Sequence, residues 1–347
     1  MINSVTYKND LNKIFESLDK IEQLNGKSIF ITGATGLIGS AIVDFLIFIA
    51  KNKKLEIEIF IGVRSPDKAY RLFGKAVNYI IYDATKHINL DYKFDYIIHA
   101  ASPANPTEYV KNPVGTMLSN LLGTNELLAY SNLNAVNKFL YISSSEVYGI
   151  KNNNEPYREN EYSYLDILND RACYPSSKRA AESLCISYAN QYGINVSIVR
   201  PGHIYGPTAS LSDTRASSQF FFDVLSGKDI IMKSKGEQIR SYCYVMDCVS
   251  SIFTVLLNGK NKSAYNISNP KSICSIYELA CKIANLSNKS VIFDTASEIE
   301  KKGYNLMLNS SLDSSLITEL GWKGQFDLET GVNHTLKILK DIWYANE

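Results

Sequence analysis

The chain has 347 residues, of which 45% are hydrophobic and 20% are charged, and its formal net charge is +1. This composition is that of a globular protein with room for one large domain or two linked domains. The near-neutral charge and the lack of a basic run argue against a nucleic-acid or membrane surface.

The N-terminal region gives no sign of export or of a membrane span. Its first 25 residues are polar and charged, unlike a secretory signal. The apolar stretch LIGSAIVDFLIFIA contains Asp44 and is about 14 residues long, which is too short to cross a bilayer. Six cysteines without a C-x-x-C pair and four scattered histidines support neither a disulfide framework nor a metal site. We therefore expect a reduced, cytoplasmic protein without a bound metal.

Hydrophobic periodicity predicts alternating helices and strands. Apolar residues at helical spacing indicate a leading amphipathic helix over residues 6–24. A buried strand (KSIFITG), a glycine-rich turn and a helix (LIGSAIVDFLIFIAK) follow. Further strands are expected at EIEIFIGV, AVNYIIYD, FDYIIHAA, KFLYISSS and NVSIVRPG, and helices around 113–131 and after Tyr174. This alternation predicts an α/β fold with a Rossmann-type, doubly wound parallel sheet.

After about residue 200 the pattern becomes shorter and mixed, as in a smaller α/β substrate domain. Residues 240–257 are expected to form a strand and a helix that rejoin the main sheet. The predicted division has three parts. They are an N-terminal helical extension (1–25), a dinucleotide-binding domain (26–200 plus about 236–262) and a nucleotide-sugar-binding domain (201–235 and 263–347).

The stretch TGATGLIG places Gly33, Gly36 and Gly39 between a strand and a helix. Glycines let the backbone approach a pyrophosphate, and the helix N-terminus supplies free N–H groups and a positive dipole end. In this context the pattern predicts a dinucleotide site. The residues expected to line it are Gly33, Thr35, Gly36, Leu37, Ile38, Gly39, Arg64, Asp83, Ala100, Ala101 and Lys178.

The end of the second strand bears on the choice of cofactor. NAD sites usually carry an acid there, hydrogen-bonded to the ribose. In IFIGVRSPDK no acid ends the strand, and Arg64 lies just beyond it. Because an arginine can pair bidentately with a 2′-phosphate, we expect NADP, with NAD as the alternative. In that alternative Arg64 is solvated or stacks on adenine, and Asp67 reaches the ribose.

A tyrosine and a lysine one helical turn apart suggest proton transfer. Tyr174 precedes Lys178 by four residues in YPSSK. A phenol with a pKa near 10 is a poor base at neutral pH, and a neighbouring ammonium group lowers that pKa. Ser144 in YISSSEVYG ends a strand, where α/β sheets place ligands, and its hydroxyl can bond the same substrate oxygen. The plainer alternatives are an amphipathic helix face and a serine-rich turn.

These motifs resemble the extended short-chain dehydrogenase/reductase family that modifies nucleotide sugars. The similar stretches, ITGATGLIGS, IIHAASPANP, NLLGTNELL, SSSEVYG, YPSSK and RPGHIYGP, lie within residues 26–260. HAASPANPTEY and RACYPSSKRAAE look closest to UDP-glucuronate decarboxylases and dTDP-glucose 4,6-dehydratases. The resemblance implies that Tyr174 is the acid/base, that Lys178 orients the ribose, and that hydride passes between sugar C4 and the nicotinamide. It also implies a homodimer through helices at about 115–131 and 174–192.

The resemblance further implies a set of substrate contacts. Arg240 stands where the family places an arginine on the diphosphate, and Arg215 is a second candidate for that duty. His203 stands where asparagine is common, and it either bonds a phosphate or makes a structural hydrogen bond. The alternative for both arginines is a surface ion pair. The predicted substrate-binding residues are Ser102, Ser145, His203, Arg215 and Arg240.

Three departures from the family bear on the reaction. Ser145 replaces the aspartate of 4,6-dehydratases, so dehydration is not expected although Glu146 is retained. The Ser–Glu pair matches decarboxylases, but residues 306–311 (LMLNSS) lack the arginine that resembles a carboxylate anchor in them. Burying a carboxylate without a cation is costly. Glu146 fits epimerases poorly.

We therefore expect an NADPH-dependent reductase of a 4-keto (6-deoxy)hexose nucleotide. In it, Tyr174 gives a proton to O4, Ser144 polarises the carbonyl and Glu146 positions sugar hydroxyls. The alternative is an NAD-retaining nucleotide-sugar decarboxylase, epimerase or 4,6-dehydratase. A non-catalytic nucleotide-binding protein is a third possibility, less favoured because a binding protein does not need a tuned phenol.

Overall fold

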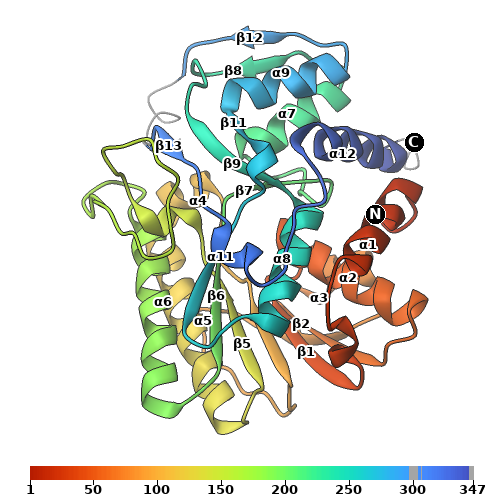
Figure 1. Cartoon of the computed structure of the whole chain (residues 1–347), viewed down its shortest axis with the longest axis vertical. Helices are drawn as coiled ribbons and strands as arrows, with labels where there is room; N and C mark the ends of the chain where they lie inside the picture. Colours follow the sequence, from red (N-terminus) through yellow and green to blue (C-terminus); the bar gives the residue numbers. More distant parts are fainter. Residues whose placement is uncertain (297–303, 306, 344–347) are drawn as a thin grey trace.

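The computed structural model describes residues 1–296, 304–305 and 307–343. Figure 1 shows a large lower part built around a sheet and a smaller upper part of short strands and helices. Within the described residues, no helix combines the length and the apolar character that crossing a bilayer requires.

The main sheet has seven strands in the order β10-β6-β5-β4-β1-β2-β3, and every neighbouring pair is parallel. The chain first places β2 and β3 on one side of β1 and then places β4, β5, β6 and β10 on its other side. The strand order therefore reverses between β1 and β4. The Rossmann-type fold predicted from the sequence is therefore confirmed. The strands are β1 (Lys27–Thr32), β2 (Ile57–Val63), β3 (Asn78–Ile81), β4 (Tyr96–His99), β5 (Lys138–Ile142), β6 (Val196–Pro201) and β10 (Ser263–Ile267).

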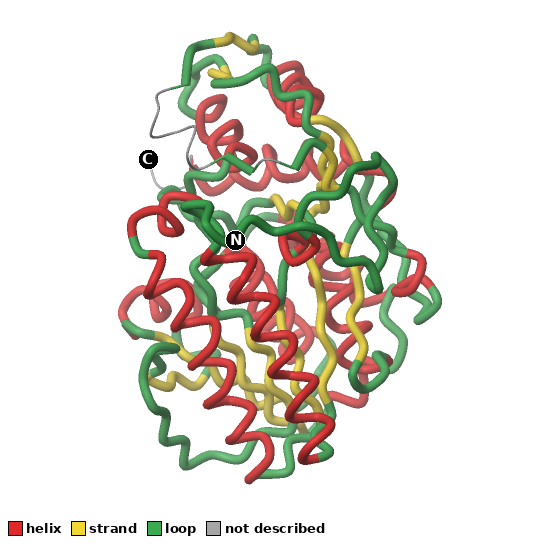
Figure 2. The backbone as a smooth tube through the Cα atoms, turned by 90° about the vertical axis from the view of Figure 1, so that its left-hand side faces the viewer, coloured by secondary structure: helices red, strands yellow, loops and turns green. Residues whose placement is uncertain are grey.

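Both faces of this sheet are covered by helices. Ile29 and Ile31 belong to the same core cluster as the apolar residues of α2 and α8, whereas Phe30 belongs to the cluster of α5 and α6. This alternation follows from the two-residue period of a strand, and burial on both faces explains the continuous apolar runs. Figure 2 shows α5 and α6 side by side over one face. The helices of this part are α2 (Leu37–Asn52), α3 (Pro66–Phe73), α4 (Pro106–Lys111), α5 (Pro113–Leu133), α6 (Cys173–Tyr192) and α8 (Val245–Asn258).

The upper part contains two small sheets. Strand β9 (Ile239–Tyr244) pairs with β7 (His203–Tyr205), β11 (Ile273–Ser275) and β13 (Asn309–Ser310). Strand β8 (Ile230–Met232) pairs with β12 (Val291–Phe293). The accompanying helices are α7 (Ala216–Leu225), α9 (Ile276–Leu286), α11 (Ser315–Thr318) and α12 (Leu328–Trp343). Short 3₁₀ turns are η1 (Ile21–Leu24), η2 (Ser145–Tyr148) and η3 (Pro270–Ser272).

Two expected elements differ in the structure. The strand within residues 240–257 joins the small sheet as β9, and the strand that returns to the main sheet is β10, which was assigned to the substrate domain. Both are short strands in which polar and apolar residues are mixed (IRSYCY and SAYNI), and periodicity does not tell which sheet such a strand joins. The helix expected over 6–24 is divided into α1 (Val5–Glu16) and η1, because Lys20 adopts a positive φ of 63° between them.

Helix α1 lies at the junction of the two parts. The Tyr7 hydroxyl donates to Asp44 Oδ2 on α2 at 2.8 Å. The Asp10 carboxylate accepts from the Tyr244 hydroxyl at 2.9 Å and lies 2.9 Å from His334 Nδ1 on α12. Burial raises the pKa of Asp44 to about 6, against the Tyr7 hydrogen bond, which lowers it. These contacts bind α1 to both parts of the molecule.

The turn after β1 requires glycine at two positions, and a third glycine leaves open space beside it. Gly33 has a positive φ of 69°, and a Cβ there would lie 2.5 Å from the Ala100 carbonyl oxygen. A Cβ on Gly39 would overlap the Gly33 carbonyl oxygen. On Gly36, which caps α2, a Cβ would meet only that same oxygen, at 3.3 Å, and would otherwise project into open space.

We predict that Asp44→Asn stabilises the protein increasingly as the pH rises. The folded-state pKa of Asp44 is raised above its unfolded value of 3.8, so ionisation opposes folding above that pH. The cost grows between about pH 4 and pH 7 and reaches about 3 kcal/mol for a shift of about two pH units. Asparagine keeps an acceptor for Tyr7 and removes the charge. Urea unfolding at pH 4, 6 and 8 measures the difference in unfolding free energy.

A matched control is Tyr7→Phe, which leaves the carboxylate buried without its donor. This variant should lose about 1–3 kcal/mol at pH 8. If Asp44→Asn raised the unfolding free energy equally at pH 4 and pH 8, the raised pKa of Asp44 would be contradicted.

We also predict different effects for two glycine substitutions in the turn. Gly39→Ala should cost about 1–3 kcal/mol of unfolding free energy, because the turn must open to admit the methyl group. Gly36→Ala should cost less than about 1 kcal/mol but should weaken retention of a dinucleotide, since its methyl group enters the predicted pyrophosphate space. Urea unfolding and the cofactor content of the purified proteins measure the two effects. Equal loss of stability in both variants would contradict this distinction.

Candidate active site

Buried polar groups connect the ends of β1 and β4. Thr32 Oγ1 lies 2.7 Å from His99 Nδ1 and accepts from the Ala101 N–H at 3.2 Å. On its other side, His99 Nε2 lies 3.2 Å from Thr124 Oγ1 on α5. Burial, and then the Lys178 charge, lower the pKa of His99 to about 3, so the imidazole is neutral. The sequence analysis did not identify this series of hydrogen-bonded groups, although His99 lies inside the motif HAAS.

The turn between β1 and α2 fits the phosphates of a dinucleotide. Gly36 has no side chain to cap α2, so the first N–H groups of the helix face the open space described above. Thr35 and Ile38 are partly exposed at this turn, but the side chain of Leu37 is buried. Leu37 therefore contributes only its backbone, and its carbonyl accepts from Thr208 Oγ1 at 2.8 Å.

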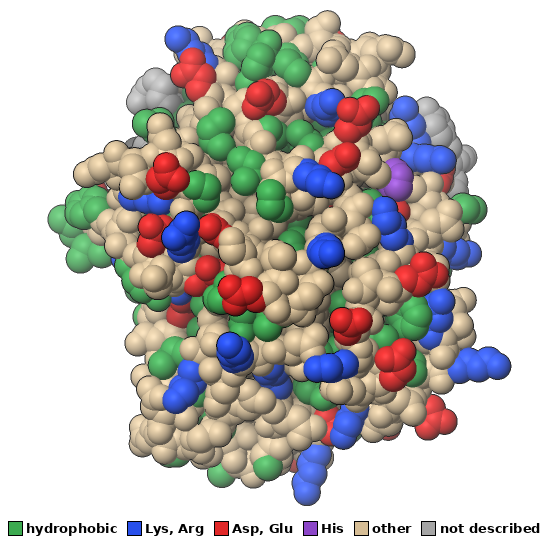
Figure 3. Space-filling model, viewed as in Figure 1, with side chains coloured by type: hydrophobic (Ala, Val, Ile, Leu, Met, Phe, Trp, Pro, Cys, Tyr) green, Lys and Arg blue, Asp and Glu red, His purple; other side chains and the backbone are tan. Residues whose placement is uncertain are grey.

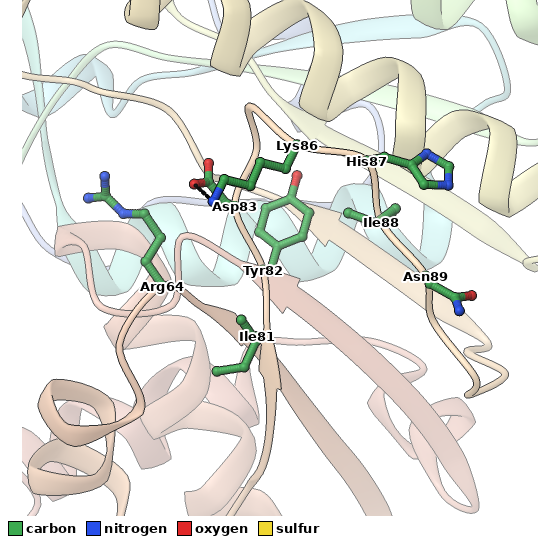
Figure 4. Close-up of a pocket in the computed structure, with 8 residues that line it drawn as sticks. All are labelled: Arg64, Ile81, Tyr82, Asp83, Lys86, His87, Ile88 and Asn89. Carbon is green, nitrogen blue, oxygen red and sulfur yellow. Dashed lines mark ion pairs between the residues drawn. The ribbon is translucent and has the colours of Figure 1, made fainter.

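The residues after β2 and β3 form a separate hollow of about 220 Å³ (Figure 4). Asp83 accepts from the Thr85 N–H and hydroxyl and lies 3.9 Å from Lys86 Nζ. The Thr85 hydrogen bonds, followed by the charges of Lys86 and Arg64, lower the pKa of Asp83. The structure thus brings Arg64 and Asp83 to the same rim, where both are open to solvent. Asp67 is exposed in the first turn of α3.

The three predicted catalytic side chains come from adjacent elements. Ser144 follows β5 and caps η2, where its Oγ accepts from the Glu146 N–H at 3.2 Å. Tyr174 lies in the first turn of α6 and is 6% exposed. One turn on, Lys178 is buried, and its Nζ donates to the Ile142 carbonyl at 2.7 Å. The carboxyl end of β5 and the start of α6 therefore build one site.

The pKa of Tyr174 differs from the expectation. Burial, and then the Glu146 charge, raise it to about 12, whereas hydrogen bonds from Ser144 and Tyr109 and the Arg215 charge oppose the rise. Burial also lowers the pKa of Lys178 to about 7, so this amine is a weaker cation than expected. Its Nζ lies 6.0 Å from the centre of the Tyr174 ring. In the protein alone, Tyr174 is therefore a protonated phenol at neutral pH.

Glu146 is held by an arginine that sequence reasoning did not select. Arg171 Nη2 donates to both carboxylate oxygens of Glu146, at 2.8 and 3.0 Å. Arg171 is 8% exposed, and its Nε has no hydrogen-bond partner among the described residues. The signal was present, since Arg171 stands three residues before Tyr174 in RACYPSSK.

A second missed residue is Tyr109 on α4. Its ring stacks on Tyr174 with 4.5 Å between centroids and 15° between planes. The guanidinium group of Arg171 lies 5.5 Å from the centre of the same Tyr109 ring. Tyr109 stands inside the quoted motif HAASPANPTEY, but nothing in its spacing indicates a contact with Tyr174.

Positive charge gathers around His203 on β7. Burial, and then the charges of Arg240, Arg215 and Arg171, hold the pKa of His203 well below its usual value. His203 Nδ1 is buried and makes no hydrogen bond with the described residues. The structure therefore brings the three predicted substrate residues His203, Arg215 and Arg240 together and adds Arg171.

The two predicted arginines have different surroundings. Arg215 caps α7 and pairs with Asp213 at 3.0 Å, which raises the pKa of the guanidinium group. Arg240 is 3% exposed and donates only to carbonyl oxygens among the described residues, those of Ile239 at 2.9 Å and Met307 at 2.8 Å. Arg240 is therefore a buried cation without a carboxylate partner in the described chain.

The remaining predicted site residues lie nearby. Ser102 is partly buried, and its hydroxyl makes a long contact of 3.4 Å with the Pro103 carbonyl. Ser145 is buried in η2, next to Ser144. Of the segment 306–311, Leu306 lies outside the described residues. The described residues contain no group of three or more His, Cys, Asp or Glu side chains that would hold a metal ion.

The sequence is similar to known proteins over most of its length. Residues 29–268 match the NAD dependent epimerase/dehydratase family. UDP-glucuronic acid decarboxylase 5 of Arabidopsis thaliana is 34% identical over 265 residues, which are 76% of this chain and 75% of that protein.

Solved structures show the same fold at lower identity. The UDP-glucose 4-epimerase of Thermotoga maritima, with UDP-glucose, aligns with a TM-score of 0.78 and 21% identity over 91% of this chain and 99% of that one. The UDP-glucuronic acid 4-epimerase of Bacillus cereus, in complex with UDP-glucuronic acid and NAD, aligns with a TM-score of 0.75 and 22% identity. The alignment covers 91% of this chain and 99% of that one. The sequence matches and the shared fold agree, and the chain belongs to the NAD dependent epimerase/dehydratase family of extended short-chain dehydrogenases.

Proposed function

We propose that this protein is an NAD-retaining decarboxylase of a nucleotide-linked uronic acid, such as UDP-glucuronate. The observation that carries the proposal is Arg240, a buried guanidinium group that has no carboxylate partner among the described residues and on which the Glu146 charge acts. The relatives named UDP-glucuronic acid decarboxylases support it. This is the alternative in the sequence analysis, and it is better supported than the reductase.

The charges of the site favour an anionic substrate. Three guanidinium groups, those of Arg171, Arg215 and Arg240, surround His203. Two carboxylates, Glu146 and Asp213, pair with the first two, so three minus two leaves one positive charge. A buried cation of this kind is stabilised by an anion that enters with the substrate. A sugar carboxylate and a diphosphate both satisfy this requirement.

The segment 306–311 supplies no cation of its own, but its backbone binds one from β9. The Met307 carbonyl accepts from Arg240 Nη1 and holds the guanidinium group in the site. Arg240 thus removes the objection to decarboxylation that the sequence of this segment raised.

The residues of the site suit oxidation at C4 followed by loss of CO₂. When bound, NAD accepts a hydride from sugar C4 and returns it later. Tyr174 first loses its own proton to solvent, and its phenolate then takes the O4 proton. The hydrogen bonds and the Arg215 charge that oppose its raised pKa favour the phenolate. A ketone at C4 is β to the C5 carboxylate, so the C5–C6 bond breaks and its electron pair moves onto O4. Tyr174 and Ser144 donate to that oxygen, CO₂ leaves, and C5 gains a proton.

NAD also fits the rim better than NADP. A 2′-phosphate beside Arg64 would lie close to the Asp83 carboxylate at the same rim, where repulsion offsets the arginine. The UDP-glucuronic acid 4-epimerase of Bacillus cereus is in complex with NAD. We propose NAD for this chain on these grounds.

A second candidate is a 4-epimerase of the same uronic acid. It requires the same oxidation at C4 and the same carboxylate contact, and the solved 4-epimerase with UDP-glucuronic acid favours it. The two reactions differ in the fate of C6, which leaves as CO₂ only in decarboxylation. We favour decarboxylation because the Ser145–Glu146 pair resembles that of decarboxylases.

We also propose the homodimer through α5 and α6. Four large apolar side chains in the first half of α5 are well exposed, as expected for a face that packs against a second copy. They are Val114, Met117, Leu118 and Leu122.

The test of the proposed function is a product assay without added cofactor. Purified protein is incubated with UDP-glucuronate, and with UDP-glucose as a matched substrate lacking the carboxylate. We expect UDP-glucuronate, but not UDP-glucose, to yield CO₂ and a UDP-pentose. Denaturing the purified protein should release bound NAD. UDP-galacturonate without CO₂ would identify the epimerase. Turnover of a 4-keto sugar that consumes added NADPH would restore the reductase.

Two substitutions test the roles within that reaction. Tyr174→Phe should abolish turnover and leave NAD content unchanged, because the phenol acts on the sugar. Arg240→Met should raise KM for UDP-glucuronate by about 10-fold or more, since a charged hydrogen bond contributes about 1.5–3 kcal/mol. Arg158→Met, an exposed arginine paired with Asp313, is the control. Equal KM values for the two arginine variants would remove Arg240 from substrate binding.

Arg64→Ala tests the cofactor preference. The NADP prediction rests on Arg64 and on the missing acid at the end of the second strand. We expect this variant to retain NAD, because NAD has no 2′-phosphate for Arg64 to bind. Fluorescence titration of the cofactor-stripped protein with NADH and NADPH measures the two affinities. A strong NADPH preference that Arg64→Ala abolishes would reverse the choice.

A further inference from the structure

The stacked pair of Tyr109 and Tyr174 is not explained by the proposed reaction. Tyr109 is 3% exposed and its ring is nearly parallel to that of Tyr174, at 4.5 Å. Aromatic pairs in this geometry contribute about 0.5–1.5 kcal/mol beyond the area they bury. Tyr174 must keep its hydroxyl on one substrate oxygen, and a stacked neighbour restricts rotation of its ring.

Tyr109 is itself held from two directions. Its carbonyl accepts from the Cys173 thiol at 3.5 Å, so its backbone is tied to the residue before Tyr174. The start of its helix is tied to the loop before Arg215, because the Thr214 hydroxyl donates to Asn105 Oδ1 at 2.6 Å. Thr107 Oγ1 lies 3.2 Å from the same Thr214 hydroxyl.

The stack also connects the acid/base with the cations of the site. Arg171 lies over the Tyr109 ring while its Nη2 holds Glu146. Arg215 follows directly after Thr214, the residue that anchors α4. Tyr109 thus stands between the two arginines and the Tyr174 phenol.

We propose that Tyr109 is a positioning residue for Tyr174, in which ring stacking fixes the plane of the phenol. The proposal rests on the acid/base role of Tyr174 in the proposed function. It is carried by the stacking geometry and by the hydrogen bonds that tie α4 to Cys173 and Thr214.

Two substitutions separate the ring from the hydroxyl. Tyr109→Phe keeps the stacked ring and removes the hydroxyl, whereas Tyr109→Leu removes both. Both are compared in the NAD-loaded protein with Tyr164→Leu, a loop tyrosine that is 68% exposed. Thermal unfolding and NAD content of each variant are measured first, so that a folding defect is recognised as such.

The readout is the pH dependence of kcat and KM for UDP-glucuronate. Tyr109→Phe should leave kcat within about 3-fold of the parent protein across the pH range, because the stacked ring remains. Tyr109→Leu should lower kcat by about 10-fold more, with KM changed less than about 3-fold, because a misplaced phenol affects the chemical step. The Tyr164 control should match the parent protein.

Other outcomes would overturn the proposal. Equal kcat in the Phe and Leu variants would reject the role of stacking. An effect on KM alone would make Tyr109 a substrate contact instead.

One measurement separates this inference from the proposed function. Reduction of bound NAD by UDP-glucuronate or UDP-glucose reports on Tyr174 before any loss of CO₂. If Tyr109→Leu slows this half-reaction and no CO₂ is formed by the parent protein, the positioning role holds and decarboxylation fails.

Discussion

The close contact between the turns after β1 and β4 is the constraint on which the site depends. Gly33 and Ala100 approach so closely that a side chain at the first position does not fit. This contact lies where the strand order reverses, and it leaves the N-terminus of α2 open. The same reversal brings β5 next to β4, so that Ser144 and Lys178 face the space beside the turn.

Burial sets the chemistry within that space. It keeps His99 neutral, raises the pKa of Tyr174 and lowers the pKa of Lys178. The charges that act on the phenol are those of Glu146 and Arg215. Further towards the upper part, the charges of Arg171, Arg215 and Arg240 act on His203. The site therefore has mixed charges near the phenol and an excess of positive charge near His203.

The sequence predicted what its motifs encode. The parallel sheet, the glycine turn and the proximity of Ser144, Tyr174 and Lys178 follow from local patterns in strand–turn–helix context. It did not predict the Arg171–Glu146 pair or the stacking of Tyr109, because both depend on tertiary contacts between separate loops. The pKa of Tyr174 was expected to fall, because spacing shows a neighbouring lysine but not the extent of burial. The short strand β9 was assigned to the wrong sheet for the same reason: its partners are distant in sequence.

Helix α1 has a consequence for the order of folding. Its polar partners Tyr244, His334 and Asp341 lie 234, 324 and 337 residues further along the chain from their contacts on α1. A helix of 12 residues is marginal in water by itself. During synthesis α1 can contact α2 early, through Tyr7 and Asp44, but its contacts with α12 must wait until that helix has been made. Closing so long a loop makes its docking a late step, so the junction of the two parts forms last.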